Sequence, residues 1–196
     1  GGDSAPEIVI NGAALASKRY PEAAFLIFGD QRKIEHLLDD HPKLLAVSRI
    51  VHTEEFVSGD DKPSVAIRQG RQSSMQLAIN AVRDEEAQCV VSAGNTGALM
   101  AMSKLTLRTL PGIDRPAICA LGPTQRGQSA MLDLGANIEC NENNLIDFAE
   151  LGSALFKSLF PDQKPLVSLL NIGSEEIKGT EILKKTSKKL DELSNE

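Results

Sequence analysis

Short apolar runs along this chain alternate with longer stretches in which apolar residues recur every three or four positions. The first pattern is typical of buried strands and the second of amphipathic helices. Strands are expected at 25–28, 45–51, 89–91, 117–121, 131–134 and 166–170, and helices at 6–19, around 34–38, around 75–82, and at 97–107, 142–159 and 180–193. Strands buried on both faces and alternating with helices predict a mostly parallel sheet in a three-layer α/β/α fold. We expect a single domain over residues 1–196.

Composition narrows the class of protein. Of the 196 residues, 41% are hydrophobic and 24% charged, which excludes a disordered chain. No run approaches the roughly 18 apolar residues that a membrane-spanning helix needs. Three widely separated cysteines argue against a disulfide framework and for a reducing compartment, so we expect a cytoplasmic protein.

The charge is unevenly distributed. The net charge is −6, which makes general nucleic-acid binding an unfavourable interpretation. Residues 62–126 carry a net +4, whereas 1–61 and 127–196 each carry −5. Either the middle third docks an anionic ligand or acidic partner, or the segregation arose by chance.

Turns at the carboxyl ends of the expected strands are the natural places for a ligand. The first spans residues 1–6, where adjacent glycines let backbone amides approach a ligand and the helix from Pro6 directs its positive end at the turn. A Gly-Gly-Asp turn normally follows a strand or helix, so we expect a strand before Gly1.

The second turn, at 92–97, reads Ser-Ala-Gly-Asn-Thr-Gly and lies between a valine-rich strand and a long helix. Exposed N–H groups at a helix start, with Ser and Thr hydroxyls, suit a phosphate. The turn is neither a P-loop nor a G-x-G-x-x-G motif. A simple helix cap with a glycine turn is the alternative.

The third turn, 133–137, begins with an aspartate at a strand end, which is costly to bury without hydrogen-bond partners. Those partners are either a ligand or a neighbouring loop. The fourth, 171–179, holds two carboxylates and a lysine that could position a substrate or accept a proton. Helix capping with a solvated charge cluster is the alternative there.

The cysteines and histidines offer little chemistry. Cys89 and Cys119 lie in apolar strands and are interpreted as core residues. Cys140 is the candidate thiol nucleophile, but it has no evident base. The three histidines show no metal-ligand spacing, and we expect neither a metal nor a cofactor.

Five stretches, taken together and in this order, resemble the PlsX family of acyl-carrier-protein:phosphate acyltransferases. The resemblance covers essentially the whole chain. The stretches are Gly1–Asp3, 92–98, 110–116, 133–137, and 171–173 with 178–179. The family begins with a strand before the first glycine pair and continues past the last helix, so the chain resembles an incomplete copy.

The resemblance implies transfer of a fatty acyl group from an acyl carrier protein thioester to inorganic phosphate, giving an acyl phosphate for phospholipid synthesis. It implies the three-layer sheet shared with phosphate acetyltransferases and isocitrate dehydrogenases. It also implies a homodimer, located peripherally at the membrane beside a glycerol-phosphate acyltransferase that makes lysophosphatidate.

Phosphate is itself a nucleophile towards a thioester, so the protein must hold it, aim it and stabilise the developing oxyanion. Residues assigned to catalysis are Asp133, Asn137 and Asn171, with the two asparagines as donors and Asp133, like Asp3, orienting its turn. The substrate-binding set is Gly2, Asp3, Ser92, Gly94, Asn95, Thr96, Gly97, Glu175 and Lys178. An acidic carrier protein would dock on the basic residues Arg68, Arg71, Lys104, Arg108, Arg115 and Arg126.

Other functions remain open from the residues. One is a phosphate acetyltransferase-like enzyme that uses acyl-coenzyme A. A nicotinamide-dependent decarboxylating dehydrogenase is another, although the arginine and aspartate clusters that it needs are not visible. A third is a non-catalytic scaffold that recruits enzymes of lipid synthesis.

Overall fold

The structure is a computed structural model, and it describes residues 2–125, 127–173 and 178–194. These residues form two compact units, Gly1–Arg108 and Thr109–Glu196. Both contain helices together with a two-stranded sheet, which confirms the α/β class. The single domain over 1–196 stays a prediction.

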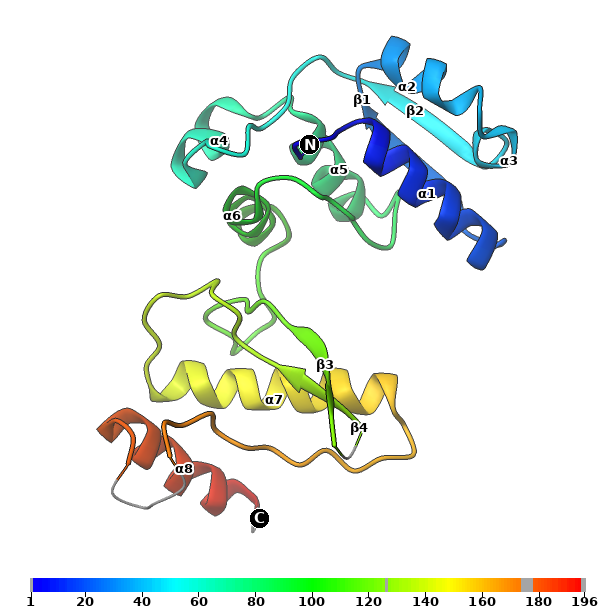
Figure 1. Ribbon diagram of the computed structural model, residues 1–196. Coiled ribbons are helices and arrows are strands. Elements are labelled where there is room, and N and C mark those ends of the chain that lie inside the picture. The colour runs from blue at the N-terminus through cyan, green and yellow to red at the C-terminus, as the bar shows by residue number, and fades with distance from the viewer. Residues whose placement is uncertain (1, 126, 174–177, 195–196) are drawn as a thin grey trace. The chain divides into compact units, whose positions relative to one another are not determined.

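The first unit holds one parallel pair of strands and most of the helices (Figure 1). Its elements are α1 (Glu7–Arg19), β1 (Phe25–Gly29), α2 (Gln31–Leu38), α3 (Pro42–Leu45), β2 (Ser48–His52), α4 (Pro63–Gln69), α5 (Ser74–Arg83) and α6 (Thr96–Leu107). β1 and β2 pair in parallel, as expected, from Phe25 opposite Ser48 to Gly29 opposite His52. The strand predicted at 45–51 starts later because Leu45 ends α3 and residues 46–47 form a turn.

Buried residues spaced four apart explain why these helices form and pack. Ile34 and Leu38 share one face of α2 and join Ile10 of α1 and Ile27 of β1 in a first hydrophobic cluster. The α2 helix begins where predicted, because the Asp30 side chain accepts hydrogen bonds from the backbone N–H groups of residues 32 and 33.

A second cluster supports the part of the first unit that carries the 92–97 turn. Met75 and Ile79 of α5 pack with Ala98 and Met102 of α6, again at a spacing of four. Val57 belongs to the same cluster. The start of α6 is therefore anchored on a buried core rather than on a mobile surface.

The second unit contains an antiparallel hairpin and two helices: β3 (Ala120–Thr124), β4 (Gly127–Met131), α7 (Glu142–Leu159) and α8 (Glu181–Ser194). The prediction that 117–121 and 131–134 form separate strands of a parallel sheet was wrong. Thr124 pairs with Gly127, and strands joined by two residues can only pair antiparallel, because a parallel pair needs a long crossover. α7 packs against β4, and α8 packs against α7.

Two predicted strands, 89–91 and 166–170, are not strands in the structure. Val91 is 90% exposed and Leu166 is 87% exposed, so neither segment is buried on both faces. A strand exists only where another strand takes up its N–H and C=O groups, and these segments pair with no strand among the described residues. Cys89 is likewise exposed, which corrects its interpretation as a core residue.

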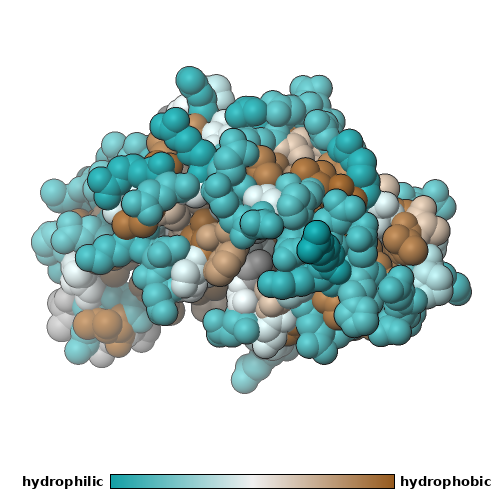
Figure 2. Space-filling view, turned by 90° about the horizontal axis from the view of Figure 1, so that it is seen from above, coloured by the Kyte–Doolittle hydropathy of each residue, from teal (hydrophilic) through white to brown (hydrophobic). Residues whose placement is uncertain are grey.

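The surface is mixed in character. On the face seen in Figure 2, hydrophobic side chains form several separate areas within a largely hydrophilic surface. Among the residues that the structure describes, every helix is too short or too polar to cross a bilayer.

Candidate functional site

Three segments far apart in sequence meet beside the start of α6: residues 2–3, the loop 58–63, and the turn 92–97. Gly2 has a φ of +97°, and a Cβ built on it would lie 2.5 Å from the carbonyl oxygen of Ala93. Only glycine permits both this backbone conformation and this approach. The predicted first and second turns are thus brought together by direct backbone packing.

Asn95 connects this turn to the loop. Its Oδ1 accepts a hydrogen bond from the Ala98 N–H at 2.9 Å, which caps α6. Its Nδ2 donates to the carbonyl oxygens of Ser58, Gly59 and Asp61 at 3.1, 3.0 and 2.8 Å. Both ends of the side-chain amide are therefore used within the protein.

The first turn of α6 offers donors to a ligand. The N–H groups of Thr96 and Gly97 have no acceptor within the helix, as in the first turn of any α-helix, and both residues are exposed. A Cβ on Gly97 would lie 3.1 Å from Cγ of Pro63, so the start of α4 borders this turn closely. The positive end of the helix dipole favours an anion at this position.

Other predicted residues of this group lie around the same turn. Ser92 accepts a hydrogen bond from the Gly94 N–H at 3.2 Å, which tightens the turn. The Asp3 carboxylate is exposed, and its Oδ1 lies 3.9 Å from where a Cβ of Gly59 would stand. Asp3 is therefore beside the loop, in keeping with an orienting role.

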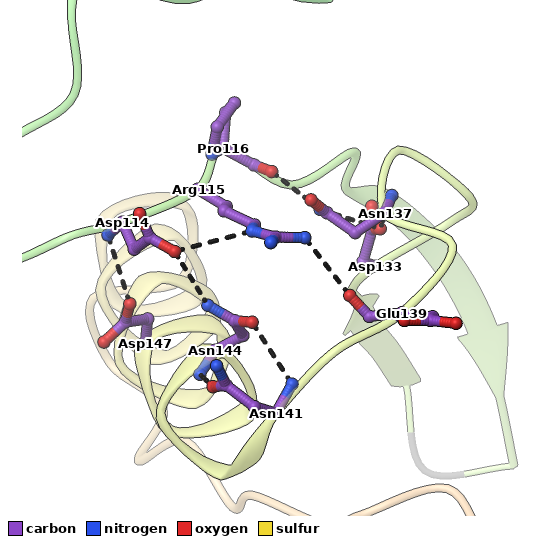
Figure 3. Close-up of polar contacts among 9 residues, drawn as sticks. All are labelled: Asp114, Arg115, Pro116, Asp133, Asn137, Glu139, Asn141, Asn144 and Asp147. Carbon is purple, nitrogen blue, oxygen red and sulfur yellow. Dashed lines mark hydrogen bonds and ion pairs between the residues drawn. The ribbon is translucent and has the colours of Figure 1, made fainter.

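In the second unit, the Asp133 carboxylate accepts hydrogen bonds from three residues, of which Asn137 is drawn with it in Figure 3. Its carboxylate accepts from the N–H groups of Ile118, Ala136 and Asn137 at 2.8, 3.2 and 2.7 Å, and from Nδ2 of Asn137 at 3.1 Å. Burial pushes the pKa of Asp133 up, but these hydrogen bonds outweigh it and hold the pKa below its ordinary value. The partners of this aspartate thus lie in its own turn and in the neighbouring segment that carries Ile118.

Asn137 is held by the same network. Its Nδ2 also donates to the carbonyl oxygen of Pro116 at 2.9 Å. This hydrogen bond connects the 133–137 turn to the 110–116 motif, which precedes β3 in the chain. The side-chain amide of Asn137 therefore donates its hydrogen bonds within the protein, to Pro116 and Asp133.

The 110–116 segment is fixed to α7 by a second group of polar contacts, also drawn in Figure 3. Asp114 accepts from Nδ2 of Asn144 at 3.5 Å and lies 3.4 Å from Nε of Arg115. Nη1 of Arg115 donates to the Glu139 carbonyl oxygen at 3.2 Å. Arg115, predicted to dock a partner, thus also connects two loops.

The Cys140 thiol is poorly suited to attack a substrate. Burial raises its pKa, the negative charge of Asp133 raises it further, and Arg115 lowers it by less. A thiol that stays protonated is a weak nucleophile. This observation weighs against the cysteine that the sequence left as a candidate.

The fourth predicted turn is described only in part, since Glu175 lies outside the described residues. Oδ1 of Asn171 accepts from the Ile172 N–H at 2.8 Å, and its Nδ2 donates to the Lys178 carbonyl oxygen at 3.3 Å. Asn171 and Lys178 are exposed and line an open groove of about 1280 Å³, bordered by α7, the 164–170 segment and α8.

The predicted docking residues divide between the units. Arg68 is exposed on α4, where its Nε donates to the Ser64 carbonyl oxygen at 3.1 Å, and Arg71 is exposed just after this helix. Lys104 and Arg108 are exposed at the end of α6, which packs against α4. Arg126 lies outside the described residues.

Sequence reasoning missed the role of the 58–63 loop. No role was expected for this segment, and its contact with Asn95 was not foreseen. The signal was a Ser-Gly-Asp-Asp-Lys-Pro run, which is rich in turn formers and long enough to project from the fold. Among the described residues, no group of three or more His, Cys, Asp or Glu side chains could hold a metal ion.

Comparison with known proteins agrees with the motifs. Residues 1–196 match the family described as "Fatty acid synthesis protein". The chain is 56% identical over 179 residues to the phosphate acyltransferase of Rhodospirillum centenum, covering 91% of this chain and 50% of that protein. It is 55% identical over 190 residues to that of Rhodospirillum rubrum, covering 97% and 54%.

A third relative, the phosphate acyltransferase of Parvibaculum lavamentivorans, is 54% identical over 193 residues, covering 98% of this chain and 54% of that protein. The chain therefore spans about half the length of the curated relatives it matches. A family match over its whole length, together with this level of identity, shows that the chain belongs to the PlsX family of fatty acid synthesis proteins.

Proposed function

We propose that the full-length protein transfers a fatty acyl group from an acyl carrier protein thioester to inorganic phosphate. The observation that carries this proposal is that relatives more than half identical to the chain are named phosphate acyltransferases. The exposed first turn of α6 supports this proposal, because its backbone N–H groups can donate hydrogen bonds to an oxyanion. The turn itself contains no carboxylate that would compete for them.

In the proposed reaction, phosphate binds at the 92–97 turn through the N–H groups of Thr96 and Gly97 and the hydroxyl of Thr96. One phosphate oxygen forms a bond to the thioester carbon, the C–S bond breaks, and the carrier leaves as its thiol after protonation. The protein forms no covalent intermediate, so it contributes positioning and charge stabilisation rather than a nucleophile.

For the 133–137 and 171–179 turns, the roles proposed rest on the resemblance to the family. Asn137 and Asn171 are proposed donors to the oxyanion that develops on the thioester carbonyl. For Asn137 this role requires Nδ2 to exchange its hydrogen bond with Pro116 or Asp133 for one with the substrate. Asp133 keeps its charge at neutral pH and fixes the 133–137 turn. Lys178 and Glu175, from the fourth turn, are proposed contacts of the substrate.

The acidic carrier is proposed to dock on the basic residues of the chain, with Arg68 and Arg71 as the principal contacts. Both are exposed and close in sequence, on and just after α4. We further propose that β1 and β2 belong to a larger three-layer sheet, and that the protein is a cytoplasmic homodimer acting peripherally at the membrane. The resemblance to the family supports these assignments.

The test is to incubate full-length protein with inorganic phosphate and either palmitoyl-carrier protein or palmitoyl-coenzyme A, and to follow acyl phosphate by ³¹P NMR. We expect phosphate-dependent product with the carrier protein. Product from the coenzyme A thioester alone would favour the acetyltransferase-like function. Thioester cleavage without added phosphate, or an acyl adduct on Cys140, would overturn direct attack by phosphate.

A further inference from the structure

The contacts of Asn95 exceed what a helix cap requires. A cap needs only an acceptor for an N–H group of the first turn, and Ser, Thr or Asp would provide one about as well. Asn95 provides that acceptor with Oδ1 and also places Nδ2 within 3.1 Å of three carbonyl oxygens. Helix capping therefore does not explain the contacts that Nδ2 of Asn95 makes with these carbonyl oxygens.

The three carbonyl groups belong to a loop that forms its own tight turn. The Ser58 N–H donates to Oδ2 of Asp61 at 2.8 Å, and the Asp61 N–H donates to the Ser58 carbonyl oxygen at 3.3 Å. This turn directs the carbonyl oxygens of residues 58, 59 and 61 towards one point, where the Asn95 amide lies. Without a donor there, three partial negative charges would face one another.

The loop also borders the segments to which phosphate binding is assigned. Gly59 of the loop lies near Asp3, and Pro63, which begins α4 shortly after the loop, lies against Gly97. A shift of the loop would therefore displace Pro63, which follows it in the chain and borders the 92–97 turn, and would bring unpaired carbonyl oxygens beside an anion. Because both ends of the Asn95 amide are already bonded within the protein, little capacity is left for direct contact with a substrate.

We propose that Asn95 is a positioning residue that fastens the 58–61 loop to the start of α6 and thereby sets the affinity for phosphate. This inference rests on the proposed function, and it replaces the direct substrate contact that the sequence predicted for Asn95. The loop is then a wall of the phosphate site, although it supplies no chemical group to the reaction.

The test compares Asn95→Ser with wild type in the full-length protein. Serine retains a capping acceptor for α6 but removes the donor to the loop. We expect the KM for phosphate to rise about tenfold, with kcat changed less than about threefold and a similar Tm. The KM for the acyl carrier protein should stay near its wild-type value.

The matched control is Asp30→Ser. It makes the same exchange of a cap for serine at α2, whose capping contacts involve Arg32 and Lys33 and not the loop. We expect its KM for phosphate to equal that of wild type. Amide hydrogen exchange of residues 58–61 should become faster in Asn95→Ser and remain unchanged in Asp30→Ser.

Direct binding of inorganic phosphate, measured by calorimetry, separates this inference from the proposed function. If wild type makes no acyl phosphate, the proposed function fails, while weaker phosphate binding by Asn95→Ser still supports the positioning role. Equal phosphate affinity in Asn95→Ser and wild type, or unchanged exchange of the loop, would overturn it. An equal fall in kcat/KM for both substrates would indicate a general structural role and would also overturn it.

Discussion

The 92–97 turn and the 133–137 turn are similar in sequence, each combining small residues, glycine and asparagine after an apolar run, but they use their backbone donors differently. In the 133–137 turn, the N–H groups of Ala136 and Asn137 are taken up by Asp133. At the start of α6, Asn95 accepts from the N–H of Ala98, and the N–H groups of Thr96 and Gly97 have no acceptor within the helix.

The difference lies in which side chain accompanies the turn. A carboxylate with a lowered pKa makes the 133–137 turn a rigid, internally satisfied element that would repel a phosphate dianion. The neutral amide of Asn95 adds no negative charge at the positive end of the α6 dipole. Anion binding is therefore better assigned to the first unit, and the Asp133 turn is better understood as a frame for Asn137.

Removing the Asp133 carboxylate should produce the largest effect. In Asp133→Ala, four hydrogen bonds to a charged group are lost, so we expect the free energy of unfolding to fall by about 2–4 kcal/mol. Activity should fall at least about 100-fold because Asn137 loses its orientation. Urea denaturation and the acyl phosphate assay measure the two effects.

Asp162→Ala, which removes an exposed carboxylate in the turn after α7, serves as the control and should resemble wild type. A stable, fully active Asp133→Ala protein would contradict the idea that the turn is a frame.

The first unit can be perturbed where Gly2 approaches the backbone of Ala93. In Gly2→Ala, the new Cβ would need the space of the Ala93 carbonyl oxygen at 2.5 Å, in a backbone conformation that alanine disfavours by about 1–2 kcal/mol. We expect the turn to shift and the KM for phosphate to rise about tenfold. Steady-state kinetics at varied phosphate measure this change.

Gly12→Ala is a matched control in the same unit, because a Cβ at Gly12 in α1 meets no atom within 4 Å. It should leave KM unchanged and stabilise the protein by up to about 1 kcal/mol. If both substitutions gave the same kinetics, the approach of residues 2 and 93 would be irrelevant to phosphate.

A smaller effect is expected where the carrier protein docks. In the double variant Arg68→Gln/Arg71→Gln, we expect the KM for the acyl carrier protein to rise about two- to fivefold with little change in kcat, since exposed charges mainly accelerate encounter. The effect should shrink as salt is added.

Lys18→Gln/Lys43→Gln removes two exposed cations from α1 and α3 instead and is the control. Equal kinetics in the arginine variant and wild type would remove the first unit from the docking model.

The smallest predicted effect is a change of stability with pH, and it occurs only at acidic pH. The lowered pKa of Asp133 means that its stabilising contribution is complete above about pH 4, the ordinary value for aspartate, and is lost as the pH falls through the lower folded-state pKa. Asp133→Asn should therefore be less stable than wild type at pH 6, with the difference narrowing below pH 4. Thermal denaturation between pH 2.5 and 6 measures it, and a constant difference would contradict a charged Asp133.

Much of the fold followed from local pattern. The spacing of Ile34 with Leu38 and of Met75 with Ile79 defined buried helix faces, and Asp30 marked a helix start, because caps and amphipathic faces are encoded within a few residues. The motifs at 92–97 and 133–137 could be located for the same reason. Strands 89–91 and 166–170 were mispredicted, because an apolar run specifies a strand only when a partner is present.

By itself, then, the sequence determined the family, the α/β class and which turns carry polar chemistry, since these depend on residue type and short-range spacing. Tertiary structure decided what those polar groups do. The amide of Asn95 meets carbonyl groups more than 30 residues away, and the carboxylate of Asp133 meets the N–H of Ile118. Hydrogen bonds act over about 3 Å, so their partners are set by how distant segments pack, which local spacing does not encode.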